Sequence, residues 1–307
     1  MYYYKIYGVN IKSDYKLEEV IEIPATETVQ VEICANRSEE ICIIQKELEE
    51  RQKDWFLYLF EKEFSRVNIK EQGLFQMEQG KKIIYQLVEG YNPLMVNQAI
   101  LCYALPVLLM QRGKLMLHGS GVLWKDKAII ISGVSGSGKS TLTAEFLEND
   151  GIFMADDTVA ITLEEDIFYA EPAYPQQKIC SNAVNERTKA KGELILLPQE
   201  ASGAKYALRL KEGFCKEKKE LSAIIIIKAA EIEQVKIKEI QGSEKIKYLT
   251  DNLYKRRVYL ENGMPVEIFK QCVEVANKVK IYELTRPKEG MTVREQVKKI
   301  KEELGKE

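Results

Sequence analysis

An octapeptide near the middle of the chain, GVSGSGKS from Gly133 to Ser140, constrains the fold more than any other feature of the sequence. It fits the pattern G-x-x-x-x-G-K-[ST] at every fixed position. An aliphatic run precedes it from Ala128 to Ile131, and a helix is predicted after it, from Thr141 to Asn149. A glycine loop between a strand and a helix turns backbone N–H groups and the helix N-terminus toward a bound phosphate. The sequence therefore predicts an α/β fold built around a phosphate-binding loop.

The residue types of this loop predict a nucleoside triphosphate, ATP with Mg²⁺, as the ligand. In the pattern, the lysine reaches the β- and γ-phosphates and the serine hydroxyl binds Mg²⁺. These roles fall to Lys139 and Ser140. The alternative, a flexible Gly/Ser turn with an incidental lysine, leaves the flanking strand and helix unexplained. The expected nucleotide-binding residues are Gly133, Val134, Ser135, Gly136, Ser137, Gly138, Lys139, Ser140 and Thr141.

Two adjacent acids, Asp156 and Asp157, follow Lys139 by 17 and 18 residues, at the end of a short apolar segment. In phosphate-loop proteins an acid at such a place holds Mg²⁺ directly or through water. Two acids allow one carboxylate to face the metal and the other to face a phosphoryl acceptor. The alternative is a pair of loop acids that cap the following turn.

The only histidine, His118, lies 21 residues before Lys139, in a strand predicted to form a hairpin with the strand before the loop. A single histidine is commonly a surface or core residue without a chemical role. Here, Gly119 and Gly121 leave the backbone uncrowded, as the close approach of a ligand requires. The hairpin is also expected to bring this segment beside the phosphate-binding loop.

Taken together, His118, the run GVSGSGKST and Ala155-Asp156-Asp157 resemble the catalytic domain of HPr kinase/phosphorylase, including their spacings. The longer run LMLHGSGV…ISGVSGSGKSTL…GIFMADD is similar to the HPr-kinase-like proteins found beside ribosomally made peptides. Those include kinases that phosphorylate lasso-peptide precursors. The resemblance covers roughly residues 92 to 230, with weaker similarity in PAYPQQK, YKRR and YELTRP, at 172–178, 254–257 and 282–287.

The resemblance implies a P-loop kinase core of the HPr-kinase/PEP-carboxykinase type, with a small and mainly β N-terminal region. It implies that Asp156 is the general base, supported by His118, and that Lys139 neutralises phosphate charge. Ser140 and Asp157 are the implied metal ligands. By analogy with the homologous kinases, a homo-oligomer is also expected.

The chain departs from the family after the acid pair. HPr kinases carry an acid followed by Ile-Arg-Gly there, whereas this chain has PAYPQQK. The resemblance therefore does not extend to HPr as the substrate, or to reversal by phosphorolysis. Basic residues that could clamp the acceptor or a phosphate, with ordinary surface residues as the alternative, are Lys178, Arg256, Arg257 and Arg286.

The function expected from these features is a Mg-ATP-dependent kinase that transfers the γ-phosphoryl group to a hydroxyl. The expected acceptor is a serine of a peptide or protein, or a small molecule with such a hydroxyl. The alternative is an NTP-hydrolysing or NTP-sensing regulatory module without an acceptor. A kinase needs a base opposite an open acceptor cleft, whereas a hydrolase needs a residue that positions water.

The sequence changes character near residue 91. Residues 1–90 contain alternating runs such as YYYKIYGVNI and VQVEICA, typical of a small, largely antiparallel sheet. The run from Ile41 begins like a strand and continues like a turn or helix. We expect 1–90 to be a recognition region and 91–307 the ATP-binding kinase domain. The second region should begin with a buried helix that is capped by Asn92 and bent near Pro106.

Further elements are expected beyond this helix. They are strands in LMLHGSGVLW, KAIIISG, IFM, KYALRL and SAIIIIK, a hairpin in VAITLEEDIFYA, and an amphipathic helix after Met291.

Composition excludes several classes of function. There are 45 basic and 47 acidic residues and no long basic run, so binding to nucleic acid or to an anionic membrane is not expected. The longest apolar stretch, Ile100–Met110, is shorter than the ~20 residues that span a bilayer. The N-terminus lacks signal-peptide features, so we expect a cytoplasmic protein. The six cysteines form no C-x-x-C pair, which favours reduced thiols over zinc ligands.

Overall fold

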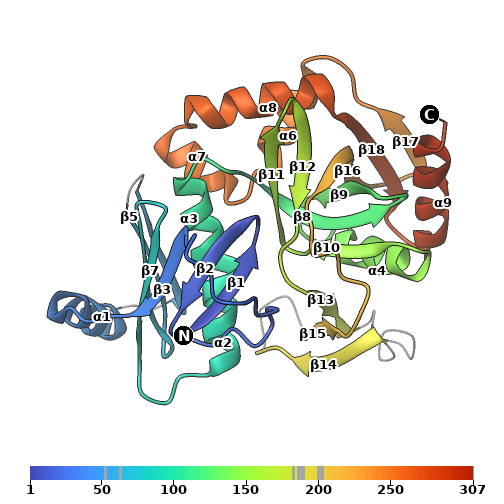
Figure 1. Cartoon of the computed structure of the whole chain (residues 1–307). Coiled ribbons are helices and arrows are strands. Elements are labelled where there is room, and N and C mark those ends of the chain that lie inside the picture. Colours follow the sequence, from blue (N-terminus) through green and yellow to red (C-terminus); the bar gives the residue numbers. More distant parts are fainter. Residues whose placement is uncertain (52–53, 62–63, 182–183, 185–190, 199–203, 307) are drawn as a thin grey trace. The chain divides into compact units, whose positions relative to one another are not determined.

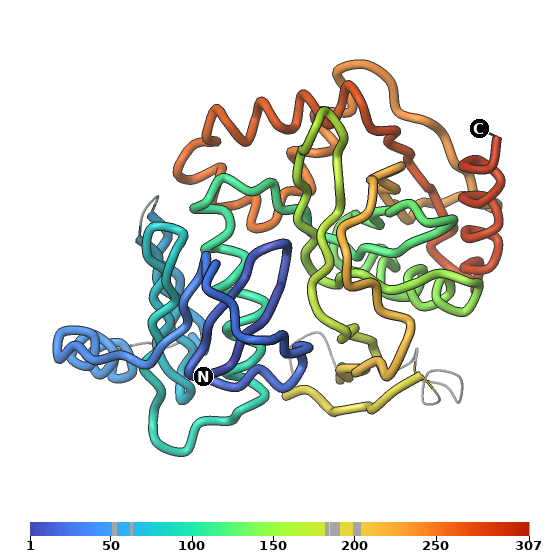
Figure 2. The backbone as a smooth tube through the Cα atoms, viewed as in Figure 1, coloured from blue at the N-terminus to red at the C-terminus, as the bar shows by residue number. Residues whose placement is uncertain are grey.

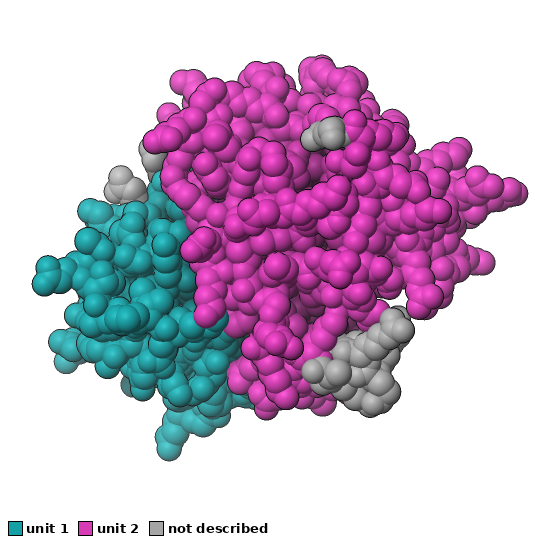
Figure 3. Space-filling model, turned by 45° about the vertical axis from the view of Figure 1, so that its right-hand side comes forward, with its two compact units in different colours: residues 1–114 teal, residues 115–307 magenta. Residues whose placement is uncertain are grey.

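The computed structural model describes residues 1–51, 54–61, 64–181, 184, 191–198 and 204–306. The chain folds into two compact units, Met1–Lys114 and Leu115–Glu307 (Figures 1 and 3). Both units combine helices with β-sheet, so the fold is a mixed α/β fold with more than one sheet.

Unit 1 contains a seven-stranded sheet in the order β1-β2-β3-β7-β6-β5-β4. The sheet is largely antiparallel, as the sequence predicts, but β3 pairs in parallel with both β2 and β7. The strands are β1 (Tyr2–Ile6), β2 (Val9–Ser13), β3 (Val31–Ala35), β4 (Phe56–Phe60), β5 (Phe64–Ile69), β6 (Gly73–Glu78) and β7 (Lys82–Leu87).

A helix, α1 (Glu39–Arg51), occupies the segment whose first half was expected to be a strand. The strand prediction at Ile41 is therefore wrong. Ile41 and Gln45 are buried and lie one helical turn apart, whereas Ile43 between them is exposed. Isoleucines favour strands locally, but here the helical spacing of the buried side chains decides the conformation.

The apolar segment after Asn92 forms a continuous helical rod of three parts: α2 (Pro93–Gln98), the π-helical η1 (Ala99–Ala104) and α3 (Leu105–Gln111). The Asn92 side chain accepts a hydrogen bond from Leu94 N at 3.0 Å and caps the rod, as predicted. The π-helical turn η1 lies directly before Leu105 and Pro106, where a bend was expected. Proline has no N–H to donate within a helix, and the preceding Leu105 N–H donates to Ile100 O, five residues back.

This helical rod contacts β5, β6 and β7, so it belongs to unit 1. The boundary between the units therefore falls after Lys114 and not after residue 90, where the change in sequence character suggested it. At 19 residues, Pro93–Gln111 is long and apolar enough to cross a membrane, longer than the apolar stretch noted in the sequence. Within the structure, 72% of its apolar window is buried, which is typical of a core helix.

Unit 2 is built on a larger sheet in the order β10-β8-β11-β12-β16-β18-β17, with β9 paired to both β8 and β16. Strands β9, β16 and β18 run parallel to one another. The members of this sheet are β8 (Leu115–Trp124), β9 (Lys127–Gly133), β10 (Ile152–Ala155), β11 (Thr158–Glu164), β12 (Ile167–Glu171), β16 (Lys219–Ala230), β17 (Lys236–Glu239) and β18 (Lys280–Pro287). A smaller sheet consists of β13 (Gln176–Cys180), β15 (Lys205–Leu210) and β14 (Gly192–Leu196).

Helices cover both faces of the larger sheet in unit 2 (Figure 1). On one face α4 (Lys139–Glu148) lies beside α9 (Val293–Leu304), as the tube in Figure 2 also shows. On the other face lie α6 (Glu244–Asp251) and α8 (Val266–Lys278), with α7 (Arg256–Asn262) between them in the chain. Apolar side chains of α4 and α9 share one core with the parallel strands: Leu142, Phe146, Val297, Ile300, Ile129, Ile131, Ile225, Ile227 and Leu284.

Candidate active site

The acid pair interrupts a strand that runs along β8. Strand β10 pairs with β8 up to Ala155, opposite Gly121, and β11 resumes with Thr158 opposite His118. Asp156 and Asp157 occupy the gap, and Asp157 adopts the left-handed backbone conformation with φ of 66°. Aspartate is one of the few residues that tolerate this conformation. The interruption therefore turns both carboxylates out of the sheet beside residues 118–121 of β8.

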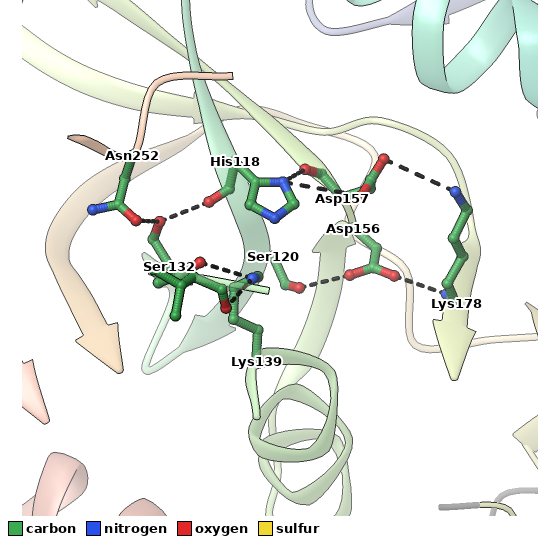
Figure 4. A network of polar contacts seen from close by, with 10 residues as sticks. His118, Ser120, Ser132, Lys139, Asp156, Asp157, Lys178 and Asn252 are labelled. Atoms are coloured by element: carbon green, nitrogen blue, oxygen red, sulfur yellow. Dashed lines mark hydrogen bonds and ion pairs between the residues drawn. The ribbon is translucent and has the colours of Figure 1, made fainter. Parts of the chain in front are cut away.

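Two side chains of β8 contact this acid pair (Figure 4). The Ser120 hydroxyl donates to Asp156 Oδ1 at 2.6 Å, and His118 Nδ1 lies 3.0 Å from the backbone oxygen of Asp157. His118 and Ser120 are two residues apart on a strand, so their side chains share one face. The contact to a carbonyl oxygen places the proton of the neutral imidazole on Nδ1.

Asp156 is the inner member of the pair. Its second carboxylate oxygen, Oδ2, accepts a hydrogen bond from the backbone N–H of Lys178 at 2.7 Å, and the residue is only 8% exposed. Burial raises the pKa of the Asp156 carboxyl, and the hydrogen bonds from Ser120 and Lys178 oppose this effect in part. Asp156 is thus an anchored carboxylate with an increased affinity for a proton.

Asp157 is the outer member, with a side chain that is 32% exposed. Burial by itself would raise the pKa of this carboxyl, but positive charges nearby outweigh burial and lower it. The Lys178 ammonium, 3.9 Å from Asp157 Oδ2, is the largest of these, and His118, with Nδ1 4.0 Å from Oδ1, contributes when its ring is protonated. Asp157 is therefore the more accessible and more acidic carboxyl of the two.

The loop Gly133–Ser140 connects β9 to α4, in the strand–loop–helix arrangement expected from the sequence. Gly133, Gly136 and Gly138 have positive φ values. At Gly133 a Cβ atom would lie 2.5 Å from the backbone oxygen of Ile227 on β16, so only glycine fits there. The Lys139 ammonium donates to the carbonyl oxygens of Gly133 and Val134, at 2.8 and 3.1 Å.

Electrostatic coupling links this loop to the acids and the histidine. Burial lowers the pKa of Lys139, and the charges of Asp156 and Asp157 oppose that shift. Burial also lowers the pKa of His118, with a further contribution from the Lys139 charge. His118 is therefore a neutral imidazole at pH 7, and the loop lysine lies close enough to the acid pair to interact with it.

The segment directly after α6, which contains Asn252 and Leu253, also contributes to the site. His118 N donates to Asn252 O at 2.9 Å, and Leu253 forms a β-bridge with Leu117 of β8. The Ser132 hydroxyl of β9 lies 2.6 Å from His118 O and 3.1 Å from Asn252 Oδ1. Asn252 and Ser132 thus fix the backbone at His118.

Sequence reasoning did not single out Ser120, Ser132 or Asn252. The spacing of two residues from His118 could have indicated Ser120. No local signal points to Asn252, because its place depends on a pairing across more than 100 residues.

The structure gives Gly119 a role other than the ligand approach inferred from sequence. A Cβ atom at Gly119 would lie 2.6 Å from the backbone oxygen of Ile131 in the neighbouring strand β9. Glycine is therefore required by the close approach of the two strands. The predicted hairpin itself is confirmed, because Gly119 pairs with Ser132, one residue before the loop.

Three of the four basic residues singled out in the sequence separate into two groups. Lys178 lies at the acid pair, as described above. By contrast, Arg256 forms an ion pair with Asp251 at 3.0 Å, and Arg257 forms one with Glu261 at 2.6 Å with its side chain 88% exposed. Their contacts are thus those of surface ion pairs on α6 and α7.

The residues available to hold Mg²⁺ are few. Within the described ranges no group of three His, Cys, Asp or Glu side chains is arranged as a metal site. Magnesium, however, is usually held by one or two carboxylates together with phosphate oxygens and water, and it prefers oxygen donors. Ser140 in the first turn of α4 and the outer carboxylate of Asp157 are donors of this kind, so the chemistry of the donor set fits Mg²⁺ bound with a nucleotide.

Comparison with known proteins adds little to this geometry. No protein-family model matches the chain, and no curated protein sequence matches it. Among solved structures, the Hpr(Ser) kinase/phosphatase from Coxiella burnetii matches with a TM-score of 0.31 and 12% sequence identity, over 62% of this chain and 97% of that chain. At this level of similarity, the function has to be inferred from the site itself.

Proposed function

We propose that this protein is a Mg-ATP-dependent phosphotransferase that acts on a hydroxyl group, with a serine side chain of a peptide or protein as the acceptor. The observation that carries the proposal is the meeting of three features at one place in unit 2. These are the glycine loop with Lys139, the acid pair after β10, and His118 on β8 (Figure 4).

The proposed reaction is a single displacement at the γ-phosphorus. The acceptor oxygen forms a bond to this phosphorus, the bond between the phosphorus and the β–γ bridging oxygen breaks, and ADP leaves. The hydroxyl proton passes to a carboxylate, for which we propose Asp156. Its raised pKa supports this role, because a general base works best when its pKa lies near the working pH. The burial of Asp156 is compatible with this role, since the contacts of a catalytic base with its substrate form on substrate binding.

The other residues supply charge and position. Lys139 leaves its carbonyl partners in the loop and neutralises charge on the β- and γ-phosphates. Ser140 and Asp157 would hold Mg²⁺, which when bound neutralises charge on the same oxygens. His118 acts as a positioning residue, because its Nδ1 proton holds the backbone carbonyl of Asp157 in the left-handed turn.

Replacement of Lys139 tests the proposal. Lys139→Ala should retain the fold but decrease phosphoryl transfer by a factor on the order of 10²–10³, since one charge-stabilising donor is lost. Lys127→Ala is the matched control, because Lys127 lies at the other end of β9 in an exposed ion pair with Glu220. Calorimetry with ATP and Mg²⁺, and transfer from γ-labelled ATP to serine peptides, give the two measurements. Equal binding and turnover in the two variants would remove the kinase assignment, whereas release of free phosphate without transfer would indicate a hydrolase.

A further inference from the structure

Arg286, at the carboxyl end of β18, contacts the glycine loop across 149 residues of sequence. Its Nε donates a hydrogen bond to the backbone oxygen of Ser137 at 2.8 Å. Its Nη1 donates to the backbone oxygens of Pro287 and Lys288, at 2.8 and 3.3 Å. These contacts hold the plane of the guanidinium group in a fixed position beside the loop.

The guanidinium lies against Gly138, the residue before Lys139. Gly138 has φ of +108°, and a Cβ atom there would lie 3.3 Å from Nε and 3.8 Å from Nη2 of Arg286. Glycine at this position therefore serves two purposes: it permits the backbone conformation, and it lets a positive charge approach the loop backbone closely.

Part of this guanidinium has no partner among the residues that the structure describes. An arginine has five N–H donors and stays charged at all accessible pH values. Across the described ranges, Nη2 makes no hydrogen bond and no carboxylate lies within ion-pair distance of Arg286. A half-buried cation without a counter-charge is costly, so the arrangement suits a site where a ligand supplies the negative charge.

The order of the strands indicates which end of the nucleotide lies near this arginine. Strand β9, which leads into the loop, has β8 on one side and β16 followed by β18 on the other. The acid pair and His118 lie on the β8 side, where the γ-phosphoryl must be for transfer to an acceptor. Arg286 comes from the β18 side, opposite to the acids. A nucleotide with its γ-phosphate toward β8 has its α- and β-phosphates on the side of Arg286.

We propose that Arg286 binds the α- and β-phosphates of the nucleotide through Nη2, while Nε holds the loop at Ser137. The nucleoside end then lies on the β18 side of the loop. This inference rests on the proposed function, because it requires a nucleoside triphosphate at the loop. It adds a second cation to the site and assigns the nucleotide a direction across the sheet.

The test compares the affinities of ATP, ADP and adenosine by calorimetry in the full chain. Arg286→Gln should weaken the binding of ATP and of ADP by the same factor, about 10- to 100-fold. This is the effect expected when a hydrogen bond to a charged group is lost. Adenosine, which has no phosphates, should bind as to the wild type. The KM for ATP should rise more than kcat falls. Arg286→Lys keeps the charge but lacks the planar group that reaches both partners, so its loss should be intermediate.

Lys288→Gln is the matched control, because Lys288 lies two residues further along the same chain and pairs with Glu231 at the surface. Lys288→Gln should leave all three affinities unchanged. Thermal melting should show that Arg286→Gln and Lys288→Gln are both folded. If Arg286→Gln loses affinity for ATP but not for ADP, or lowers kcat with unchanged affinities, the assignment of Arg286 to the α- and β-phosphates is overturned. A wild-type chain that binds neither nucleotide would overturn the proposed function together with this inference, whereas wild-type binding with an unaffected Arg286→Gln variant overturns this inference alone.

Discussion

Asp156 and Asp157 are chemically identical, yet their surroundings give them different properties. Asp156 has both carboxylate oxygens hydrogen-bonded and a raised pKa, whereas Asp157 is partly exposed and has a lowered pKa. Asp156→Asn keeps the shape of the side chain, and its amide can still accept from Lys178 N while it donates to the Ser120 hydroxyl, but the base is removed. We therefore expect transfer to fall by a factor on the order of 10²–10⁴, with little change in the affinity for Mg-ATP.

The companion variant, Asp157→Asn, should instead raise the Mg²⁺ concentration that is needed for half-maximal transfer. Measuring ATP affinity and transfer for both variants across a Mg²⁺ series separates the roles. If Asp156→Asn weakens Mg-ATP binding as much as it slows transfer, Asp156 is a metal ligand. If Asp157→Asn abolishes transfer even at saturating Mg²⁺, the outer carboxylate is the base and the assignment must be reversed.

His118 gives a prediction for the pH dependence of stability. Burial and the Lys139 charge lower its pKa in the folded chain below the ordinary value of 6.5. As the pH falls below about 6.5, the unfolded chain takes up this proton before the folded chain does, so the free energy of unfolding decreases. The loss from this group ends once the pH is below the pKa of the folded state.

Because the chain has a single histidine, one imidazole proton signal in NMR follows this titration directly. Its midpoint should lie below 6.5, and the stability of His118→Gln should lack the corresponding change between pH 7 and pH 5. A midpoint at or above 6.5 would contradict the burial of a neutral ring beside Lys139.

At the scale of elements, the local sequence was sufficient to predict those helices and strands that are marked by turn residues or by a regular spacing of apolar residues. The strands β8 and β9, the hairpin β11–β12 and the amphipathic helix α9 all follow the prediction. The tight turn at Lys125-Asp126 has two positive φ values, and so does the turn at Glu165-Asp166. Such turns match the twist of antiparallel strands and favour Asp, Asn or Gly, and each of these two turns contains an aspartate.

Pairing between distant elements could not be predicted in the same way. Alternation in β2 and β3 identifies strands but not their partners, so the parallel pairs of unit 1 had no signal. The site shows the same division. Its loop and acid pair are visible as motifs, whereas Asn252 and Arg286 reach it through contacts across 120 and 149 residues.

The helix α9 offers a test of packing behind the loop helix. Ile300 is fully buried in the core that α9 shares with α4, and Lys299 beside it is about one-third exposed. Ile300→Ala should decrease the free energy of unfolding by about 2–5 kcal/mol because it leaves a cavity. Lys299→Ala should change it by less than about 0.5 kcal/mol. Urea unfolding measures both, and equal effects would show that α9 does not pack as described.

At the scale of the whole molecule, the contacts described for the site all lie within unit 2. A fragment that begins at Leu115 is therefore expected to bind Mg-ATP with an affinity close to that of the full chain. The role of residues 1–90 as a recognition region stays a prediction. If it is correct, the fragment should lose affinity for a peptide acceptor while it retains ATP binding.

Circular dichroism and calorimetry on the fragment decide between these outcomes. A fragment that fails to fold would show that the two units depend on each other for stability. A fragment that folds and phosphorylates the acceptor as well as the full chain would remove the recognition role of unit 1.

The parallel strands of unit 2 also bear on how the chain reaches its folded state. The Ser222 hydroxyl of β16 donates to Ala128 O of β9 across 94 residues, and the Arg286–Ser137 contact spans still more. Pairings of such long sequence separation form slowly, because a large loop must close before any contact stabilises it. Gly133 takes its shape against Ile227 of β16. We therefore expect the glycine loop to be completed late in folding, so that a nucleotide binds only those chains whose distant strands have already come together.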